Sequence, residues 1–581
     1  MRRIFSSRNL VLSLLAALAA LACIPRIDIG ISTLDDGFYA YAAESILDGK
    51  LIHRDFFSQY VGYQHYIHAL FFRLYGENYL TLRYPLIISQ FISCLAAALI
   101  FRQKPFIVQL AAITIALGFG VLLFKNPSTS WSCVALVLVI TALLSSSKPG
   151  NPSRSKLLAL GLLLGLVFGI RHPTAIFLGM GVLCHQTILT TRSEATFKSS
   201  RASNVVLTLG LLLALTSLLA YMLKASTVVD LAPWFVAPVS YMVYSLSNVK
   251  RTDSHQTLAN LTWIGVGFIA AISPWLISTT AHNNWKATWI DLSTMPTDYS
   301  SMLTFTTADF AGNILFIVSH PPNAQAILGA AVSAVGLLFP LLLAASIWRL
   351  HKNPRIQAWA LSPVSIMAAF HTLVLVALVS SLYLSYVLCL QFLSILALAT
   401  QIKNHRARNA AISALIATSA GSFVFLTPQF EPAGNVSYLG SMPRTLSKCW
   451  LPRCDLRTIA DNNIISKEAY DALEKIKRPD STVTVLPWGY HYEFSYPSNY
   501  RPKYPDIRLP LYRHVPAEIA FQDILNERDP VILIEKVAMR DESVYPEFLN
   551  YFAIYFAKAY DGPIFMILVK KNRSQRASHQ S

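Results

Sequence analysis

Long apolar segments follow one another along most of this 581-residue chain, and they constrain its fold more than any other feature. A helix of about 20 apolar residues crosses a hydrocarbon core of roughly 30 Å. Hydrophobic residues make up 54% of the chain and charged residues 14%, whereas about a quarter of the residues of a soluble protein are charged. This composition excludes a soluble globular protein and predicts a polytopic α-helical membrane protein.

We expect about thirteen transmembrane helices, because that many apolar runs reach spanning length. Twelve segments carry them: 10–24, 80–101, 106–124, 130–146, 157–170, 174–190, 204–223, 230–248, 259–279, 326–348, 358–399 and 410–427. The segment 358–399 is too long for one crossing and is expected to break near residues 380–383, which gives two helices. Residues 280–325 then form a long outer loop.

The formal net charge is +17, and its placement indicates a membrane topology. The basic residues lie mostly in short connections between spans, where positive charge marks the cytoplasmic side. A nucleic-acid-binding protein would instead gather them on one soluble face, so we expect no nucleic-acid partner. Arg2, Arg3 and Arg8 precede the first span, which places the N-terminus in the cytoplasm. The sequence therefore predicts a multi-pass protein of the cytoplasmic (inner) membrane that contacts membrane lipids.

The chain divides into a transmembrane module at 1–427, a soluble-like domain at 428–570 and a disordered polar tail at 571–581. The domain is expected to be α/β and extracytoplasmic, with helices at 466–477, 516–526 and 545–560 and strands at 481–486, 531–535 and 563–569. Cys449 and Cys454 lie in this region. In an oxidising compartment they can form a disulfide, and two unlinked thiols are the alternative.

The first outer loop, residues 26–79, carries the densest cluster of acidic and aromatic residues. Asp35 and Asp36 are adjacent, and a helical period puts Asp36 and Glu44 on one face. The apolar residues between 38 and 70 predict two amphipathic helices along the membrane surface. Asp35 has two interpretations: it caps the helix that begins at Asp36, or it acts as a general base whose pKa the neighbouring carboxylate raises.

Two stretches, LDDGFYAYAAESILDGKLIHRDFF and SQYVGYQHYIHALFFRLYGENYLTLRYP, carry a resemblance to a known family. Along them the chain resembles the polyprenyl-phosphate-sugar-dependent glycosyltransferases of the GT-C superfamily. The similarity is to the bacterial branch related to protein O-mannosyltransferases and the aminoarabinose transferase of lipid A. It pairs Asp35 and Asp36 with the acidic pair of that family, and Asp55 with the aspartate of its R-D-F-F stretch.

The resemblance implies a GT-C-type catalytic module at 1–427 and an inverting single displacement. A hexosyl or pentosyl group would move from a polyprenyl-phosphate-linked donor to an envelope lipid, glycan or protein acceptor on the outer face. Asp35 would take the acceptor proton, and Asp36 would position the acceptor or raise the pKa of its neighbour. We expect no cofactor and no metal, although the acidic pair can hold a divalent cation. Several family members carry Lys-Pro-Pro where this chain has Tyr60, Val61 and Gly62, so the donor-phosphate lysine does not carry over.

Another cation must therefore stabilise the leaving phosphate. The candidates at outer span ends are Arg83, Lys125, Arg171 and His172. For each of them an interfacial anchor is the alternative, and Arg171 with His172 is favoured because the pair interrupts an apolar stretch without a nearby acid. The candidates for positioning substrate are Glu44, His53, Arg54, Asp55 and Tyr60. A solvated turn is the alternative for residues 53–55.

The outer loop at 280–325 contains Trp285, Trp289 and Asp291. Such residues suit sugar stacking, and they suit an interfacial aromatic belt, which we favour. The rival function is a transporter or flippase of lipid-linked sugars, which predicts symmetric halves and charges in mid-span. A non-catalytic envelope assembly protein is a third hypothesis.

Overall fold

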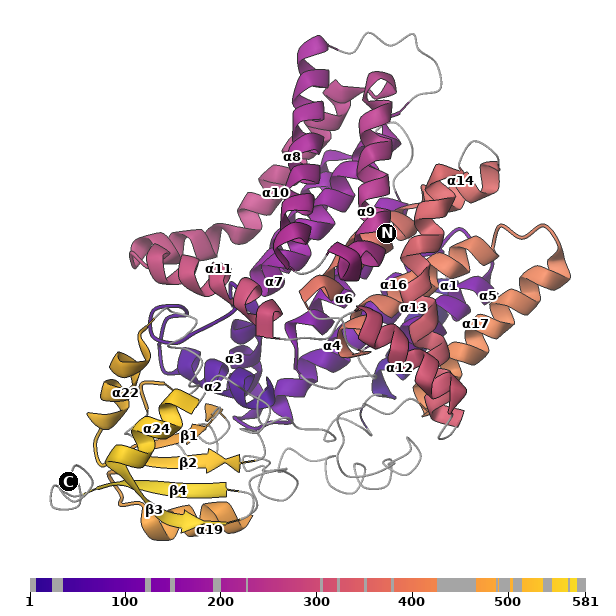
Figure 1. Ribbon diagram of the computed structural model, residues 1–581. Coiled ribbons are helices and arrows are strands. Elements are labelled where there is room, and N and C mark those ends of the chain that lie inside the picture. Colours follow the sequence, from indigo (N-terminus) through magenta and orange to yellow (C-terminus); the bar gives the residue numbers. More distant parts are fainter. Residues whose placement is uncertain are drawn as a thin grey trace.

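The computed structural model describes most of the helical part and much of the C-terminal part of the chain. The described residues are 7–22, 24, 35–120, 127–146, 152–191, 200–225, 228–302, 307–320, 324–349, 353–377, 381–425, 467–486, 489–490, 502–504, 515–536, 546–562 and 565–571. Lys125, Cys449 and Cys454 lie outside them. Figure 1 shows a large helical bundle with a small sheet at one end.

The bundle is formed by long apolar helices together with shorter ones. Its helices are α1 (Ser7–Leu21), α4 (Tyr84–Ile100), α5 (Phe106–Gly118), α6 (Thr129–Ser145), α7 (Arg154–Leu189), α8 (Arg201–Ala225), α9 (Val228–Asn248), α10 (Ser254–Ala281), α12 (Thr307–Ser319), α13 (Ala324–Trp348), α14 (Pro354–Ala360), α15 (Pro363–His371), α16 (Ser381–Ala399) and α17 (His405–Phe425). Within the described residues, five helices are long and apolar enough to span a membrane. A sixth span results if α14 and the following segment, bent by 52°, count as one.

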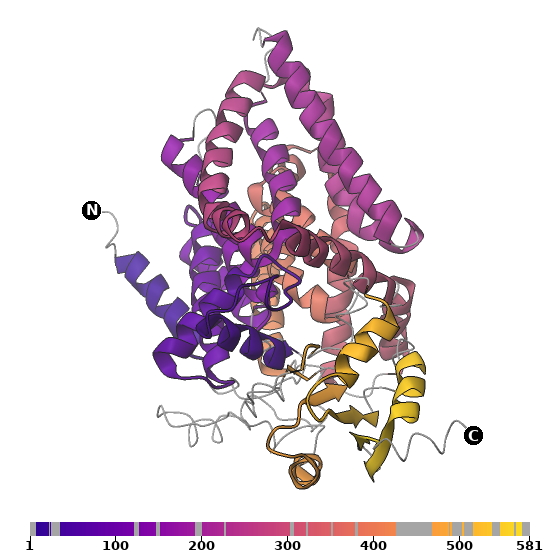
Figure 2. The same ribbon diagram turned by 90° about the vertical axis from the view of Figure 1, so that its left-hand side faces the viewer.

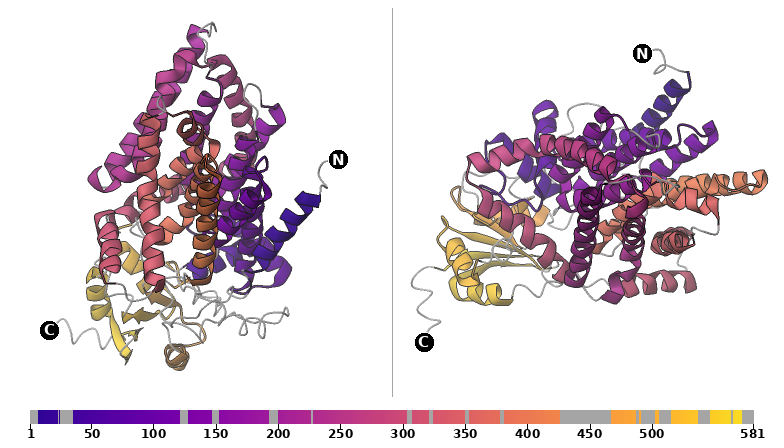
Figure 3. Two further views of the ribbon diagram at one scale, coloured as in Figure 1. Left: turned by 90° about the vertical axis from the view of Figure 1, so that its right-hand side faces the viewer. Right: turned by 90° about the horizontal axis from the view of Figure 1, so that it is seen from above.

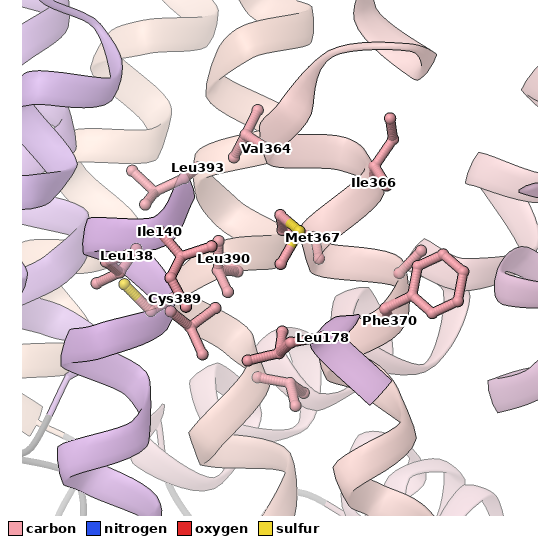
Figure 4. Close-up of a cluster of buried hydrophobic side chains, with 14 of the residues drawn as sticks. Leu138, Ile140, Leu178, Val364, Ile366, Met367, Phe370, Cys389, Leu390 and Leu393 are labelled. Atoms are coloured by element: carbon pink, nitrogen blue, oxygen red, sulfur yellow. The ribbon is translucent and has the colours of Figure 1, made fainter. Parts of the chain in front are cut away.

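The helical bundle of a polytopic membrane protein is thus present, and the count of about thirteen spans stays a prediction. Buried aliphatic and aromatic side chains from α6, α7, α15 and α16 interlock at its centre, as Figure 4 shows for Leu138, Leu178, Phe370 and Leu390. The predicted outer loop at 280–325 is largely helical, because it contains α11 (Trp285–Met302) and α12.

Helix α7 is broken at Arg171, the residue at which we expected one span to end. Arg171 has an extended backbone (φ −150°, ψ 92°), and Pro173 follows it. A straight helix of this length would measure about 54 Å, yet both halves of α7 reach the same part of α10. An added Cβ on Gly161 would meet the Ile264 carbonyl at 2.0 Å, while Asn260, one turn earlier, donates to the Gln186 side chain at 3.1 Å. Helix α7 therefore folds back on itself at Arg171.

Three of the basic connections, those at the start of α1, between α4 and α5 and between α6 and α7, lie close together. The Arg8 guanidinium donates to the Lys104 carbonyl at 2.7 Å. The Ser146 carbonyl accepts from Arg102 at 3.3 Å and from Lys156 at 3.1 Å. The Ser146 contacts place two cations at the C-terminal end of α6, where the helix dipole favours positive charge. The assignment of this side to the cytoplasm stays a prediction.

The first outer loop forms two helices at the opposite end of α4, as the sequence predicted, but α2 is not the amphipathic surface helix that we expected, because residues 36–45 are all buried. They are α2 (Asp35–Leu47) and α3 (Tyr63–Tyr75), and the single turn η2 (Thr81–Arg83) leads from α3 into α4. Gly62 precedes α3 with φ 103°, a backbone conformation that suits glycine. One buried cluster joins these helices to the C-terminal unit.

The C-terminal unit is α/β, with α19 (Lys467–Ile476), β1 (Val483–Leu486), α22 (Ala517–Leu525), β2 (Val531–Glu535), α24 (Pro546–Tyr555), β3 (Phe556–Asp561) and β4 (Phe565–Lys570). The strand order is β1-β2-β4-β3, with β1 parallel to β2 and the other pairs antiparallel. The ring of Tyr490 meets Phe38 and Tyr41 of α2 at centroid distances of 5.2 and 5.4 Å. The sheet and α1 lie on opposite sides of the molecule (Figure 2 and Figure 3).

The helix predicted over residues 545–560 of this unit is wrong for its C-terminal part. We expected a helix over 545–560, but the helix ends at Tyr555 and residues 556–561 form β3. The apolar residues continue past 555 at a spacing that also fits a helix. Pairing with β4 decides the structure, because β3 and β4 form a hairpin whose Gly562 amide donates to the Phe565 carbonyl at 3.0 Å.

Candidate functional site

Arg171 lies inside the bundle at the break in α7, with 5% of its surface exposed. Its Nη1 donates to Ser130 Oγ in the first turn of α6 at 2.9 Å. The guanidinium carbon lies 5.8 Å from the ring centre of Tyr60 and 5.5 Å from that of Tyr383 on α16. No carboxylate forms an ion pair with it among the described residues, and its buried Nε has no hydrogen-bond partner there. A buried cation in this state suits an anionic ligand.

Tyr60 connects Arg171 with the first outer loop. It was a candidate for positioning substrate, and it also faces the ring of His172, at a centroid distance of 6.2 Å. His172 is partly buried beside Arg171, with a buried Nδ1 that has no partner in the described part of the chain. Arg171 and His172, the pair favoured from the sequence, therefore belong to one cluster with Tyr60.

The two aspartates at the start of α2 lie in different environments: Asp35 is partly exposed and Asp36 is buried. Asp35 is the first residue of α2 and is partly exposed. Its charge acts on Tyr39, one turn later, whose pKa is raised above the ordinary value by burial and then by Tyr60 and Asp35. The Tyr39 hydroxyl accepts from the Thr129 amide at 3.3 Å, next to Ser130. Tyr39 thus links Asp35 with the Arg171 cluster.

Asp36 is fully buried and forms a two-bond ion pair with Arg83. Arg83 Nε donates to Oδ1 at 3.0 Å and Nη2 to Oδ2 at 3.1 Å, and both side chains are 0% exposed. This pair ties α2 to the start of α4. Arg83 was a candidate for the donor phosphate, and the structure gives it a carboxylate partner instead.

His53 and Asp291 form a second buried pair. His53 Nδ1 lies 3.0 Å from Asp291 Oδ2, and the two side chains are 2% and 0% exposed. Asp291 belongs to α11, so the pair connects the first outer loop with that helix. The neighbouring Arg54 and Asp55 instead pair with each other at 2.8 Å on the surface. Of the segment 53–55, His53 alone is buried with a partner from a distant helix.

The remaining candidates occupy other positions. Glu44 is buried on α2. Lys125, Cys449 and Cys454 lie outside the described residues. Trp285 and Trp289 are 43% and 73% exposed, as side chains of an interfacial belt are. No group of three or more His, Cys, Asp or Glu side chains with metal-site geometry occurs within the described ranges.

Two histidines on α3 lie beside Tyr39 and are neutral. Burial lowers the pKa of His65 and of His68 to about 3 in each case. His65 Nε2 lies 3.1 Å from Ser58 Oγ, and His68 Nε2 lies 2.8 Å from the Gln64 amide nitrogen. They contact the Tyr39 ring at centroid distances of 5.6 and 5.3 Å. These uncharged rings pack against Tyr39.

Sequence reasoning missed Tyr39, Ser130 and Tyr383, because a tyrosine or serine in an apolar run has no distinguishing signal. Asp291 was noted only as one acid in a long loop. An acid six residues after Trp285 and two residues after Trp289 is a weak signal. Its pairing with a histidine 238 residues away comes from the fold.

Comparison with known proteins gives few matches. No protein-family model and no curated protein sequence matches the chain. The crystal structure of ArnT from Cupriavidus metallidurans bound to undecaprenyl phosphate aligns with 98% of this chain and 99% of that chain, at 11% identity and a TM-score of 0.39. The apo state of ArnT from Cupriavidus metallidurans aligns with 97% of this chain and 98% of that chain, at 12% identity and a TM-score of 0.38. Scores this low do not establish a common fold.

Proposed function

We propose that this protein is an integral membrane glycosyltransferase of the GT-C type. It moves a hexosyl or pentosyl group from a polyprenyl-phosphate donor to an envelope lipid, glycan or protein on the outer face of the cytoplasmic membrane. The observation that carries the proposal is the buried Arg171, which has no acidic partner among the described residues and lies next to the first outer loop.

The cost of burying a charge supports a phosphate at Arg171. Burying an unpaired guanidinium inside a membrane bundle costs roughly several kcal/mol, even after the surrounding protein and water have rearranged. A phosphate offers charge and two oxygens in the geometry of a guanidinium fork. The rings of Tyr60 and Tyr383, 5.8 and 5.5 Å from the guanidinium carbon, give the cation apolar surroundings in which a phosphate is bound more strongly than in water.

The reaction follows from these groups. The acceptor oxygen attacks the anomeric carbon while the bond from that carbon to the phosphate oxygen breaks, so the configuration inverts. Asp35 takes the acceptor proton. The electron pair leaves with the polyprenyl phosphate, whose charge Arg171 stabilises. Asp36 is held by Arg83 and supports α2 instead of taking a proton.

A second candidate function is transport of a lipid-linked sugar. The broken helix α7 with a buried charge at the break favours it, because transporters place such breaks at their substrate sites. Reconstitution in liposomes with an undecaprenyl phosphate that carries a radiolabelled hexose or pentose separates the two. Transfer of the label to envelope lipid supports the enzyme, and movement of the label across the bilayer without transfer supports the transporter. If the label is neither transferred nor moved, both functions are contradicted.

Asp35→Asn tests the proposed base in the same assay. The variant is expected to insert in the membrane normally and to lose transfer by about 10²–10⁴-fold, the usual contribution of a general base. A correctly inserted Asp35→Asn protein with full activity would remove Asp35 from the mechanism.

A further inference from the structure

A cavity of about 310 Å³ lies between the first outer loop, the start of α3 and the last turns of α10. Ile52, Val61 and Trp275 supply apolar wall, and His53, Thr279 and Asn284 supply polar groups. Neither Arg171 nor any other residue of α6, α7 or α16 lines it. Figure 1 shows α3, α10 and α11 converging at this side of the bundle.

His53 is held in the wall of this cavity by a strained and well-fixed backbone. Its φ is +66°, which costs a residue other than glycine about 1 kcal/mol or more. The His53 amide donates to the Phe56 carbonyl at 2.8 Å, and the Asn284 side chain donates to the Ile52 carbonyl at 3.0 Å. Asp291 holds the ring from the other side. Strain that the surroundings maintain in this way is typical of functional positions.

The contact with Asp291 occupies one nitrogen of the His53 ring and leaves the other for a ligand. With the hydrogen on Nδ1, donated to Asp291, Nε2 is a hydrogen-bond acceptor. This Nε2 is buried and has no hydrogen-bond partner in the described part of the chain. The indole Nε1 of Trp275, in the wall of the same cavity, is a buried donor that also lacks a partner among those residues.

One acceptor and one donor in a single cavity match a hydroxyl group, which both donates and accepts. The wall contains no Lys, Arg, Asp or Glu, so the cavity suits an uncharged group and not a phosphate. Around it, exposed apolar side chains of α3 and α10 face outward, including Tyr66, Leu70 and Ile277 at 47%, 54% and 68% exposure. Such a surface faces lipid.

We propose that this cavity binds the hydroxylated end of an uncharged amphiphile that enters from the bilayer. The hydroxyl donates to His53 Nε2 and accepts from Trp275 Nε1. If the proposed function holds, this amphiphile is the acceptor class, a membrane lipid with a neutral hydroxyl. Asp291 is then a positioning residue, because it fixes the His53 ring.

The test is selective binding of an alcohol to the full-length protein in nanodiscs. In the methyl ether of bromoundecanol a methyl group replaces the hydroxyl hydrogen, and bromine quenches the fluorescence of nearby tryptophan. Quenching of the protein's tryptophan fluorescence follows the binding of each compound, and the quantity compared is the ratio of their two dissociation constants. We expect the alcohol to bind about tenfold more tightly than the ether, the effect of one buried hydrogen bond.

His53→Phe and His53→Asn are expected to reduce this ratio to about one. Asn tolerates the positive φ, so it guards against misfolding. His255→Phe is the matched control, because His255 is exposed at the other end of α10, and it is expected to keep the ratio.

Equal binding of alcohol and ether to the unmodified protein would overturn the inference without any variant. An unchanged ratio in a folded His53 variant would overturn it too. Because the readout needs no turnover, selective alcohol binding by a protein that transfers no sugar would keep this inference and reject the proposed function.

Discussion

At position 171 a guanidinium is enclosed by two tyrosine rings and a serine hydroxyl, with no carboxylate from the described chain to balance it. If the ligand supplies the missing charge, Arg171→Gln should leave the melting temperature of the ligand-free protein unchanged or raise it, since a desolvated charge is removed. Thermal unfolding in detergent measures this. A structural arginine would behave differently, because its removal would cost about 3–5 kcal/mol.

The Asp36–Arg83 pair should show the opposite behaviour. Asp36→Asn leaves a fully buried guanidinium without its counter-charge, so a loss of about 3–5 kcal/mol is expected. The double variant Asp36→Leu with Arg83→Met removes both charges and should recover most of that loss. A double-mutant cycle on thermal stability measures the coupling. Independent, additive effects would show that the pair does not hold α2 against α4.

Sequence reasoning found Arg171 because a basic residue in an apolar stretch is visible without a structure. It could not separate His53 from Arg54 and Asp55, since three adjacent polar residues give one signal. The structure separates them by burial, with His53 at 2% exposure and Arg54 and Asp55 paired in solvent. Nor could it predict that Arg83 is neutralised by Asp36, because a contact between residues 47 positions apart depends on how α2 meets α4.

At the scale of elements, α7 packs closely against α10 on the N-terminal side of the break at Arg171. An added Cβ on Gly267 of α10 would meet the Leu158 carbonyl at 2.3 Å, whereas nothing lies within 4 Å of one on Gly265. Gly267→Ala should therefore lower the melting temperature by several degrees and reduce activity. Gly265→Ala, on the same helix, should be neutral or stabilise by about 0.5–1 kcal/mol. Equal effects of the two variants would contradict this packing.

The apolar pattern predicted most element positions, including α2, α3, β2 and a break at residue 171. It failed where two structures fit the same residues, as at β3. The segment 556–561 has too few residues to distinguish a helical from a strand period, and its pairing partner lies beyond the next turn. The local pattern of apolar residues therefore predicts the helices of the bundle, whereas the edge strand β3 depends on its pairing with β4.

At the scale of the whole molecule, the C-terminal unit packs on α2 and carries its own pH dependence. Burial raises the pKa of Glu527 from 4.5 to about 7, although the Lys503 amide donates to it at 2.8 Å. A raised carboxyl pKa favours the protonated folded state, so this contribution is full below pH 4.5 and is lost as pH rises through about 7.

Stability of the unit should thus fall by about 1–3 kcal/mol over that range. Hydrogen exchange of the β1 and β2 amides in the full-length protein, corrected for intrinsic rates, measures it. Glu527→Gln should remove the slope. A slope that persists in the variant would mean that another group is responsible.

The account as a whole depends on a lipid-linked phosphate at Arg171, and its most direct test is native mass spectrometry of the full-length protein with undecaprenyl phosphate and with undecaprenol. The unmodified protein should retain the phosphate at least about tenfold better than the alcohol. Arg171→Gln should abolish that preference, and Arg154→Gln, which alters a guanidinium over the Trp263 ring, should preserve it. Equal retention of both lipids by the unmodified protein, or an undiminished preference in Arg171→Gln, would contradict the account.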